Sequence, residues 1–315
     1  MSPSDVVRLK ADTTGLPVKT DTTGLPVKTD TAELPVKADT SRLPLKSVVT
    51  LWCPSLAGAL AALLLSGCAA HLPPRPAGTP AADPTAADAF IAATTACKGF
   101  RSVEGELSLS GHAGSERVRG RILTGLESGG AVRLEAVAPF GAPFFILAGR
   151  NEKATLVLPR DHRVLRETAV ADVLERLTGL SLGADDLRLI MSGCLVDHAS
   201  PSDGQQWPGG WRAVTIGPER VAYLRVVNGH TILAAADYGK WRVDYSEHAS
   251  GFPRVVRVRR AGDNEIDITA RIEQLAVNTQ INPKAWDVEV PSDADPMTLD
   301  ELRSIAPLAD RTKQN

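Results

Sequence analysis

The sequence predicts an α+β fold of about eleven antiparallel strands, with one helix ahead of the strands and a pair of short helices inserted among them. Three observations predict it. In residues 103–159 and 212–278, apolar and polar residues alternate in short segments. Gly, Pro or polar turns separate these segments, and short turns favour antiparallel pairing. Residues 170–179 and 183–193 instead carry apolar residues at helical spacing.

The first helix is expected in the alanine-rich segment 85–99, where Phe90 and Ile91 are available for burial and Gly99 is a suitable end. The strands before the helix pair are VEGELSLSG, RVRGRIL, VRLEAVA, FFILAG and ATLVLP. Those after it are RAVTIG, RVAYLRVVNG, HTILAAADYG, KWRVDYSE, PRVVRVRRAG and NEIDITARIEQLAVN. Many of the later strands are joined by tight turns, as at Asn228–Gly229.

The two inserted helices have recognisable ends. The first places its apolar residues on one face and ends at Gly179. The second is bounded by Gly183 and Gly193, and Asp185 and Asp186 are expected to cap it.

Residues 48–67 have the composition of a secretory signal peptide. Residues 59–65 are only Ala and Leu, and the hydrophobic part is shorter than the roughly 20 residues that a membrane-spanning helix needs. The quartet LSGC, which ends at Cys68, resembles the bacterial lipobox, in which the chain is cut before the cysteine and the cysteine is acylated. The resemblance implies a cell-envelope lipoprotein beginning at Cys68; a membrane helix that ends in a cysteine is the other interpretation.

Residues 1–47 contain four copies of a nine-residue unit, DTTGLPVKT, DTTGLPVKT, DTAELPVKA and DTSRLPLKS. Each copy carries one proline among mostly polar residues, a composition that neither continues a helix nor builds a core, so we expect disorder. The repeats are either upstream DNA translated from a misplaced start or a genuine cytoplasmic extension.

The remaining chain divides into three parts. Residues 68–84 are proline-rich and are expected to be an extended tether, which at about 3.1 Å per residue holds a domain roughly 40 Å from the membrane. Residues 85–291 form the predicted domain. Residues 292–315 are expected to be a C-terminal tail with a short helix.

The charge pattern argues against nucleic-acid binding, because the net charge is −2 and no domain is basic. The one arginine-rich segment holds Arg254, Arg257, Arg259 and Arg260, interleaved with valines. This alternation favours a solvated strand face over a contact with anionic lipid.

We find no motif of an enzyme, a metal site or a cofactor site. HExxH, GxxxxGK, GxGxxG and CxxC are all absent from the sequence. GLSLG matches GxSxG, but its Ser181 falls in the predicted turn between two helices, whereas a nucleophile elbow follows a strand. The sequence therefore predicts a protein that is not an enzyme, with no catalytic residue, metal or cofactor.

Cysteine usage predicts one disulfide. Cys53 falls in the signal peptide and Cys68 is the acylated residue, which leaves Cys97 and Cys194 as the thiols of the mature domain. In an oxidising periplasm such a pair is expected to be bonded. Two buried free thiols are the alternative.

The segment APFGAPFF, residues 138–145, interrupts the strands with two prolines and a glycine. It is predicted to be a turn that carries Phe140, Phe144 and Phe145. At least one of them is expected to protrude; burial of all three in the core is the alternative.

The order helix, strands, helix pair, strands resembles the LolA and LolB families, and three segments resemble LolB. APFG is similar to that family's Pro-Leu-Gly loop, ERLTGLSLGADDLRLIMSG to its helix pair, and KWRVDYSEHASGFPRVVRV to its Trp, Val, Tyr and Pro pattern. The resemblance covers roughly residues 99–278. It implies a curved antiparallel half-barrel whose open side is covered by the helices.

The resemblance also implies a function. A LolB-like protein is a lipid-anchored, periplasm-facing protein of the outer membrane that binds acyl chains in a hydrophobic groove. It receives acylated lipoproteins from a LolA-like periplasmic carrier and inserts them into the membrane. The residue after the anchor, Ala69, agrees with the outer membrane, because in the family rules Asp there favours the inner membrane. Phe140, Phe144 and Phe145 would form the loop that meets membrane or cargo, with Phe140 at the place of the family's leucine.

The chain departs from the LolB pattern in its paired cysteines, in the segment 194–210 and in having Phe140 in place of leucine. A second hypothesis is therefore an envelope structural or assembly lipoprotein that uses the same fold to bind a protein partner.

Overall fold

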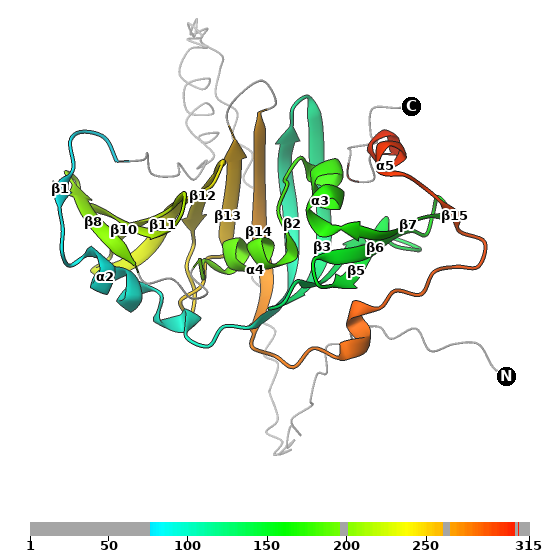
Figure 1. Ribbon diagram of the computed structural model, residues 1–315, viewed down its shortest axis with the longest axis horizontal. Helices are drawn as coiled ribbons and strands as arrows, with labels where there is room; N and C mark the ends of the chain where they lie inside the picture. The colour runs from blue at the N-terminus through cyan, green and yellow to red at the C-terminus, as the bar shows by residue number, and fades with distance from the viewer. Residues whose placement is uncertain (1–75, 196–200, 261–264, 306–307, 309–315) are drawn as a thin grey trace, which may run out of the picture. The chain divides into compact units, whose positions relative to one another are not determined.

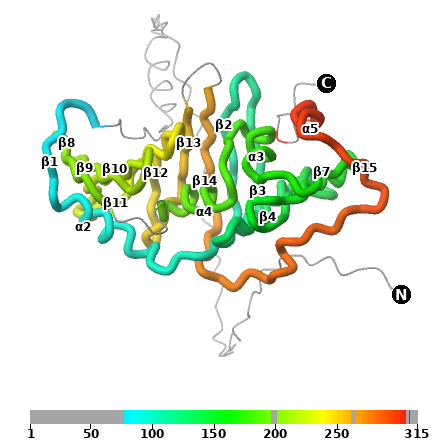
Figure 2. Tube along the Cα trace, in the orientation of Figure 1, coloured from blue at the N-terminus to red at the C-terminus, as the bar shows by residue number. Residues whose placement is uncertain are grey.

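The computed structural model describes residues 76–195, 201–260, 265–305 and 308, all within the unit Cys68–Asn315. The predictions for the repeats, the signal peptide and Cys68 fall outside the described residues. Figure 1 shows the fold as a ribbon and Figure 2 as a trace.

The described chain forms one open, curved sheet of fifteen strands, in the order β1-β8-β9-β10-β11-β12-β13-β14-β2-β3-β4-β5-β6-β7-β15. Neighbours pair antiparallel except β15, which is parallel to β7. The strands are β1 (Ala81–Ala82), β2 (Ser102–Ala113), β3 (Glu116–Glu127), β4 (Ala131–Val137), β5 (Phe145–Arg150), β6 (Lys153–Leu158), β7 (Arg163–Ala169), β8 (Ser202–Trp207), β9 (Trp211–Gly217), β10 (Arg220–Val227), β11 (His230–Tyr238), β12 (Trp241–Ser246), β13 (Val255–Arg260), β14 (Ile266–Val277) and β15 (Asp295–Pro296). The helices are α2 (Ala86–Ala93), α3 (Val170–Thr178), α4 (Ala184–Ser192) and α5 (Leu299–Ile305), with 3-10 turns η2 (Thr95–Cys97) and η3 (Pro283–Trp286).

The predicted half-barrel of about eleven antiparallel strands was wrong: the sheet is open and mixed and has fifteen strands. Four strands, β1, β7, β8 and β15, were not predicted. β1 and β15 are two residues long, too short for any periodicity. β8 reads SDGQQW, with polar residues on both faces, and β7 reads RVLRETA, in which the apolar Val164 and Leu165 are adjacent and do not alternate with polar residues.

The sheet is built from two successive meanders, β2–β7 and β8–β14, joined by the pairing of β14 with β2. This junction needs glycine. A Cβ on Gly105 would lie 2.3 Å from the carbonyl oxygen of Gln274, closer than any side chain tolerates. A register shift between Ile272 and Gln274 lies in the same part of the junction.

The helices cover the sheet in separate places. α2 contacts β8, β9, β10 and β11, and α4 contacts β2, β3 and β4. α5 packs against α3, so residues expected to form a tail belong to the packed structure. Figure 2 shows the segment after β14 crossing to β15 beside β7.

The arginines of β13 are paired rather than free. Arg257 is hydrogen-bonded to Asp267 of β14, and Arg259 to Asp244 of β12. The hydrogen bonds from Arg257 hold the pKa of Asp267 below its usual value. Arg260 lies over the ring of Trp241. Arg257 and Arg259 thus lie on one face of β13, half-buried and paired with carboxylates, whereas the consecutive Arg260 lies on the other face.

Cys97 and Cys194 form a disulfide, with Cα atoms 5.3 Å apart, in agreement with the sequence-based expectation. The bond joins the end of η2 to the residue that follows Gly193 at the end of α4. It therefore fixes the C-terminal end of α4 to the segment that follows α2.

Candidate functional site

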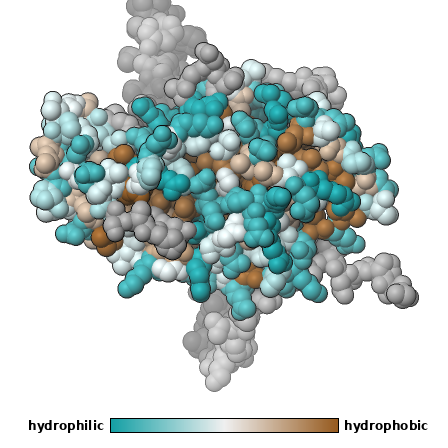
Figure 3. Space-filling model, in the orientation of Figure 1, coloured by the Kyte–Doolittle hydropathy of each residue, from teal (hydrophilic) through white to brown (hydrophobic). Residues whose placement is uncertain are grey.

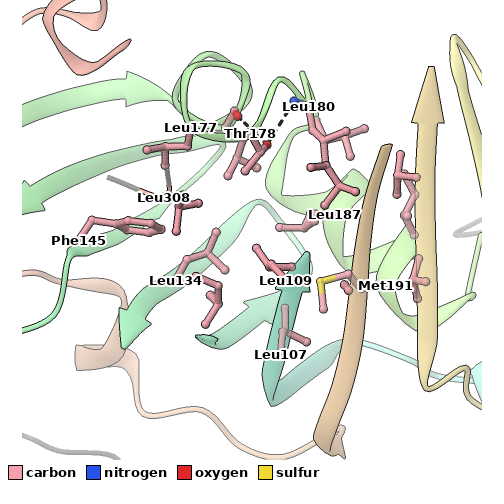
Figure 4. A pocket seen from close by; sticks show the side chains of 18 residues that line it. Leu107, Leu109, Leu134, Phe145, Leu177, Thr178, Leu180, Leu187, Met191 and Leu308 are labelled. Atoms are coloured by element: carbon pink, nitrogen blue, oxygen red, sulfur yellow. Dashed lines mark hydrogen bonds between the residues drawn. The ribbon is translucent and has the colours of Figure 1, made fainter. Parts of the chain in front are cut away.

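An apolar cavity lies between the sheet and the helices α3 and α4. Its floor is formed by β13, β14, β2, β3, β4 and β5, which are consecutive neighbours in the sheet. Its roof is formed by α3, α4 and the turn between them, and Figure 4 shows the side chains around the space. The lining is Leu107, Leu109, Ile122, Leu134, Phe145, Leu174, Leu177, Thr178, Leu180, Leu182, Leu187, Ile190, Met191, Val256, Val258, Ile268, Ala270 and Leu308.

Thr178 is the one polar side chain in this lining, and its hydrogen-bonding capacity is used locally. Its hydroxyl donates to the carbonyl oxygen of Leu174 at 2.8 Å and accepts from the amide of Leu180 at 3.2 Å. A buried water needs two to four polar partners, and the lining offers none that is free. The cavity is therefore suited to hydrocarbon and not to water or to a polar headgroup.

The volume of the cavity limits what it holds in this conformation. It measures about 80 Å³. An engineered apolar cavity that binds benzene measures about 150 Å³. Only part of an acyl chain fits the present space, so a complete chain requires the roof to shift.

α4 is fixed at both ends. Glu152, in the turn between β5 and β6, accepts hydrogen bonds from the amides of Ala184 at 2.6 Å and Asp185 at 2.9 Å. These bonds satisfy donors at the helix start and place a carboxylate at the positive end of its dipole. The expectation that Asp185 and Asp186 cap this helix was wrong, because the capping carboxylate comes from another turn. The disulfide of Cys194 fixes the other end.

Further contacts hold the middle of α4. Arg188 is fully buried; its Nε donates to Asp185 at 3.1 Å, and its guanidinium lies 5.2 Å from the ring centre of Phe100. Asp186 accepts from the hydroxyl of Tyr238 at 2.5 Å. Burial, and then this hydrogen bond, raise the pKa of Tyr238 well above its ordinary value. α4 is thus the rigid half of the roof.

α3 has fewer polar attachments. The amide of Val170 donates to the carbonyl oxygen of Glu152 at 3.0 Å, and Arg176 pairs with the exposed Asp300 at 3.3 Å. Exposed pairs of this kind contribute little to stability. Gly179 ends the helix with φ +78°, and a Cβ there would lie 2.7 Å from Cδ1 of Ile266. α3 is therefore held mainly by its buried apolar face, whereas α4 is held by polar contacts and a disulfide as well.

The three phenylalanines of the loop between β4 and β5 have different surroundings. Phe140 is 89% exposed, and Phe145 is 2% exposed and lines the cavity. Phe144 is half-buried, with the guanidinium of Arg160 4.4 Å from its ring centre. Arg160 also donates to the carbonyl oxygens of Phe140 at 2.8 Å and Ala142 at 2.9 Å. Arg160 therefore braces a loop whose tip carries an exposed aromatic ring.

The described residues present no constellation typical of catalysis or metal binding. Ser181 lies in the turn between α3 and α4 and follows no strand. In the described ranges, no group of three or more His, Cys, Asp or Glu is arranged to hold a metal. None of the described helices has the length and apolar character to cross a membrane. Figure 3 shows apolar residues in small separate groups among polar ones on the viewed face.

Two contributors to the site were not predicted from the sequence. Glu152 acts on α4 from a turn that is distant in the sequence, and Leu308 reaches the cavity from a segment expected to be a tail. Nothing local distinguishes either residue, because both roles depend on contacts across the fold.

Comparisons with known proteins give structural matches only. No protein-family model and no curated protein matches the chain. A LolA superfamily protein from Nitrosomonas europaea matches with 10% identity and a TM-score of 0.42, over 62% of this chain and 96% of that one. A DUF1329 family protein from Desulfovibrio piger matches with 11% identity and a TM-score of 0.40, over 64% and 96%. The lipoprotein LppX of Mycobacterium tuberculosis matches with 12% identity and a TM-score of 0.28, over 64% and 98%.

Proposed function

We propose that this protein is a lipoprotein of the outer membrane that holds an acyl chain in the cavity beneath α3 and α4. One observation carries the proposal: six neighbouring strands and two helices surround a space whose lining has one polar side chain, already hydrogen-bonded. Each acyl methylene that moves from water into such a space contributes roughly 0.8 kcal/mol. Binding of this kind needs no catalytic group, and we assign the protein no enzymatic activity.

The cargo in this proposal is the acyl chain of another lipoprotein, received from a LolA-like periplasmic carrier. Acylation of Cys68 would hold the domain on the periplasmic side of the outer membrane, and residues 68–84 would give it reach. Because α4 is fixed at both ends, the chain would enter by displacement of α3.

A second hypothesis, an assembly lipoprotein that binds a protein partner in the same groove, predicts polar side chains inside the groove. Thr178 is the one polar residue of the lining, and its hydroxyl is bonded to the backbone. The lining therefore favours the acyl chain over the protein partner as its ligand.

The direct test is titration of the purified protein with 11-(dansylamino)undecanoic acid. We expect saturable binding with a blue-shifted emission, because the chain moves to an apolar site. Palmitate should compete for this site, whereas a short-chain acid such as butyrate should not. An emission that stays unchanged up to the solubility limit of the probe would refute the proposal.

We expect Phe140→Glu to slow delivery of the bound probe to phospholipid vesicles by about tenfold while leaving binding unchanged. An aromatic ring prefers the apolar side of an interface, and a carboxylate in its place opposes entry into the membrane. The melting temperature should stay the same, because Phe140 is 89% exposed. Delivery is measured by loss of energy transfer from a vesicle-bound partner dye.

The matched control is Val226→Glu, which introduces the same charge at another exposed apolar side chain in β10. It should not slow delivery. Equal delivery by the Phe140 variant and the native protein would remove this loop from the mechanism. A lowered melting temperature would mean that the ring packs against the domain in solution.

A further inference from the structure

Leu308 occupies part of the acyl cavity although it belongs to the segment after α5. Its side chain is 4% exposed and is one of the cavity-lining groups. Figure 4 shows it among Leu134, Phe145 and Leu177, which come from the floor and the roof. The cavity of about 80 Å³ is thus what remains beside a resident apolar side chain.

The backbone of Leu308 is seated on an open stretch of β3. β4 pairs with β3 from Arg121 to Glu127 and, in the described part of the chain, does not extend along the earlier residues of β3. The amide of Arg119 donates to the carbonyl oxygen of Leu308 at 3.2 Å. A Cβ on Gly120 would lie 3.1 Å from Cδ2 of Leu308, so the glycine leaves room for the side chain.

α5 ends at Ile305, close to Leu308 in the sequence, and its N-terminal end is anchored to the sheet. Thr298 and Glu301 form a reciprocal cap at its start, since the Thr298 amide donates to Glu301 at 2.7 Å and the Glu301 amide to the Thr298 hydroxyl at 3.3 Å. Glu301 also accepts from Arg163 of β7 at 2.8 Å. The backbone hydrogen bond from Thr298, followed by the side-chain bond from Arg163, lowers the pKa of Glu301 to about 2, so this attachment is charged at neutral pH.

We propose that Leu308 is a built-in plug that an incoming acyl chain displaces. This inference rests on the proposed function, because it concerns the same cavity. A backbone hydrogen bond with Arg119 and a buried isobutyl group hold Leu308 in place. A long acyl chain buries many more methylenes, each worth roughly fourfold in affinity, so it displaces the plug. The empty protein then keeps its apolar cavity covered.

The test compares two substituted chains and two shortened chains with the native protein, using 11-(dansylamino)undecanoic acid as the probe. Leu308→Ala removes the plug side chain, whereas Leu308→Met keeps a side chain of similar volume. A chain ending at Ile305 lacks the plug, whereas a chain ending at Leu308 retains it. We expect Leu308→Ala and the chain ending at Ile305 to bind the probe about tenfold more tightly than the native protein. The two controls should bind as the native protein does.

The outcomes separate the plug from the proposed function. Equal, measurable affinity in all five proteins would overturn the plug and leave acyl-chain binding intact. No binding by any of them would overturn both. Weaker binding by Leu308→Ala, with a lowered melting temperature that the probe does not restore, would make Leu308 an ordinary core residue and overturn the plug.

Discussion

Replacing Cys97 and Cys194 together by alanine should lower the free energy of unfolding by up to about 4.7 kcal/mol, the chain-entropy value for a loop of roughly 100 residues. The two cysteines are 97 residues apart in the sequence, and their bond closes a loop that contains the first meander and both roof helices. Without the bond, the unfolded chain has a higher conformational entropy, and this lowers the free energy of unfolding. Urea titration followed by circular dichroism measures the change.

The double variant is the informative one, because a single substitution leaves a thiol that can form other disulfides. Treatment of the native protein with dithiothreitol should reproduce the effect of the double variant. Identical midpoints for the native protein and the double variant would show that the bond contributes nothing.

Ala270→Leu should weaken binding of 11-(dansylamino)undecanoic acid roughly sixtyfold. The substitution adds three carbon atoms at a floor position of β14 that lines the cavity. If these atoms exclude about three methylenes of the ligand, and each is worth roughly fourfold, the losses multiply to this value. Stability should be unchanged or slightly higher, because the new side chain fills existing space. Probe titration and thermal melting together measure both effects.

Thr269→Leu is the matched control, because the next residue of a strand points to the opposite face of the sheet. It should leave probe binding as it is. A native-like affinity in the Ala270 variant, with the fold intact, would place the ligand outside this cavity.

The helix pair and the disulfide were predictable because their signals are local or compositional. Gly179 and Gly193 end the two roof helices with φ of +78° and +72°, values that favour glycine. In the residues that precede each of these glycines, the apolar side chains recur at the spacing of a helix with one buried face. The cysteine pair followed from counting the thiols of a chain that was predicted to be exported to an oxidising compartment, with no knowledge of the fold.

The width and openness of the sheet were not predictable in the same way. β8 is stabilised by β9 and β1, not by apolar alternation, since its residues are mostly exposed. β15 exists because a distant segment reaches the edge of β7. The cap from Glu152 and the seat of Leu308 likewise join residues far apart in the sequence. Such features depend on tertiary contacts that local propensity does not encode.

The pairing of β14 with β2 has a consequence for how the chain folds. β2 is synthesised early, whereas its partner β14 is synthesised late, at the end of the second meander. Until β14 is available, one edge of β2 in the first meander has no strand partner. Contacts of this sequence separation slow folding, and an open strand edge is a template for association with other chains. The time between synthesis of the first meander and arrival of β14 is therefore the interval in which this protein is most exposed to aggregation and most dependent on chaperones.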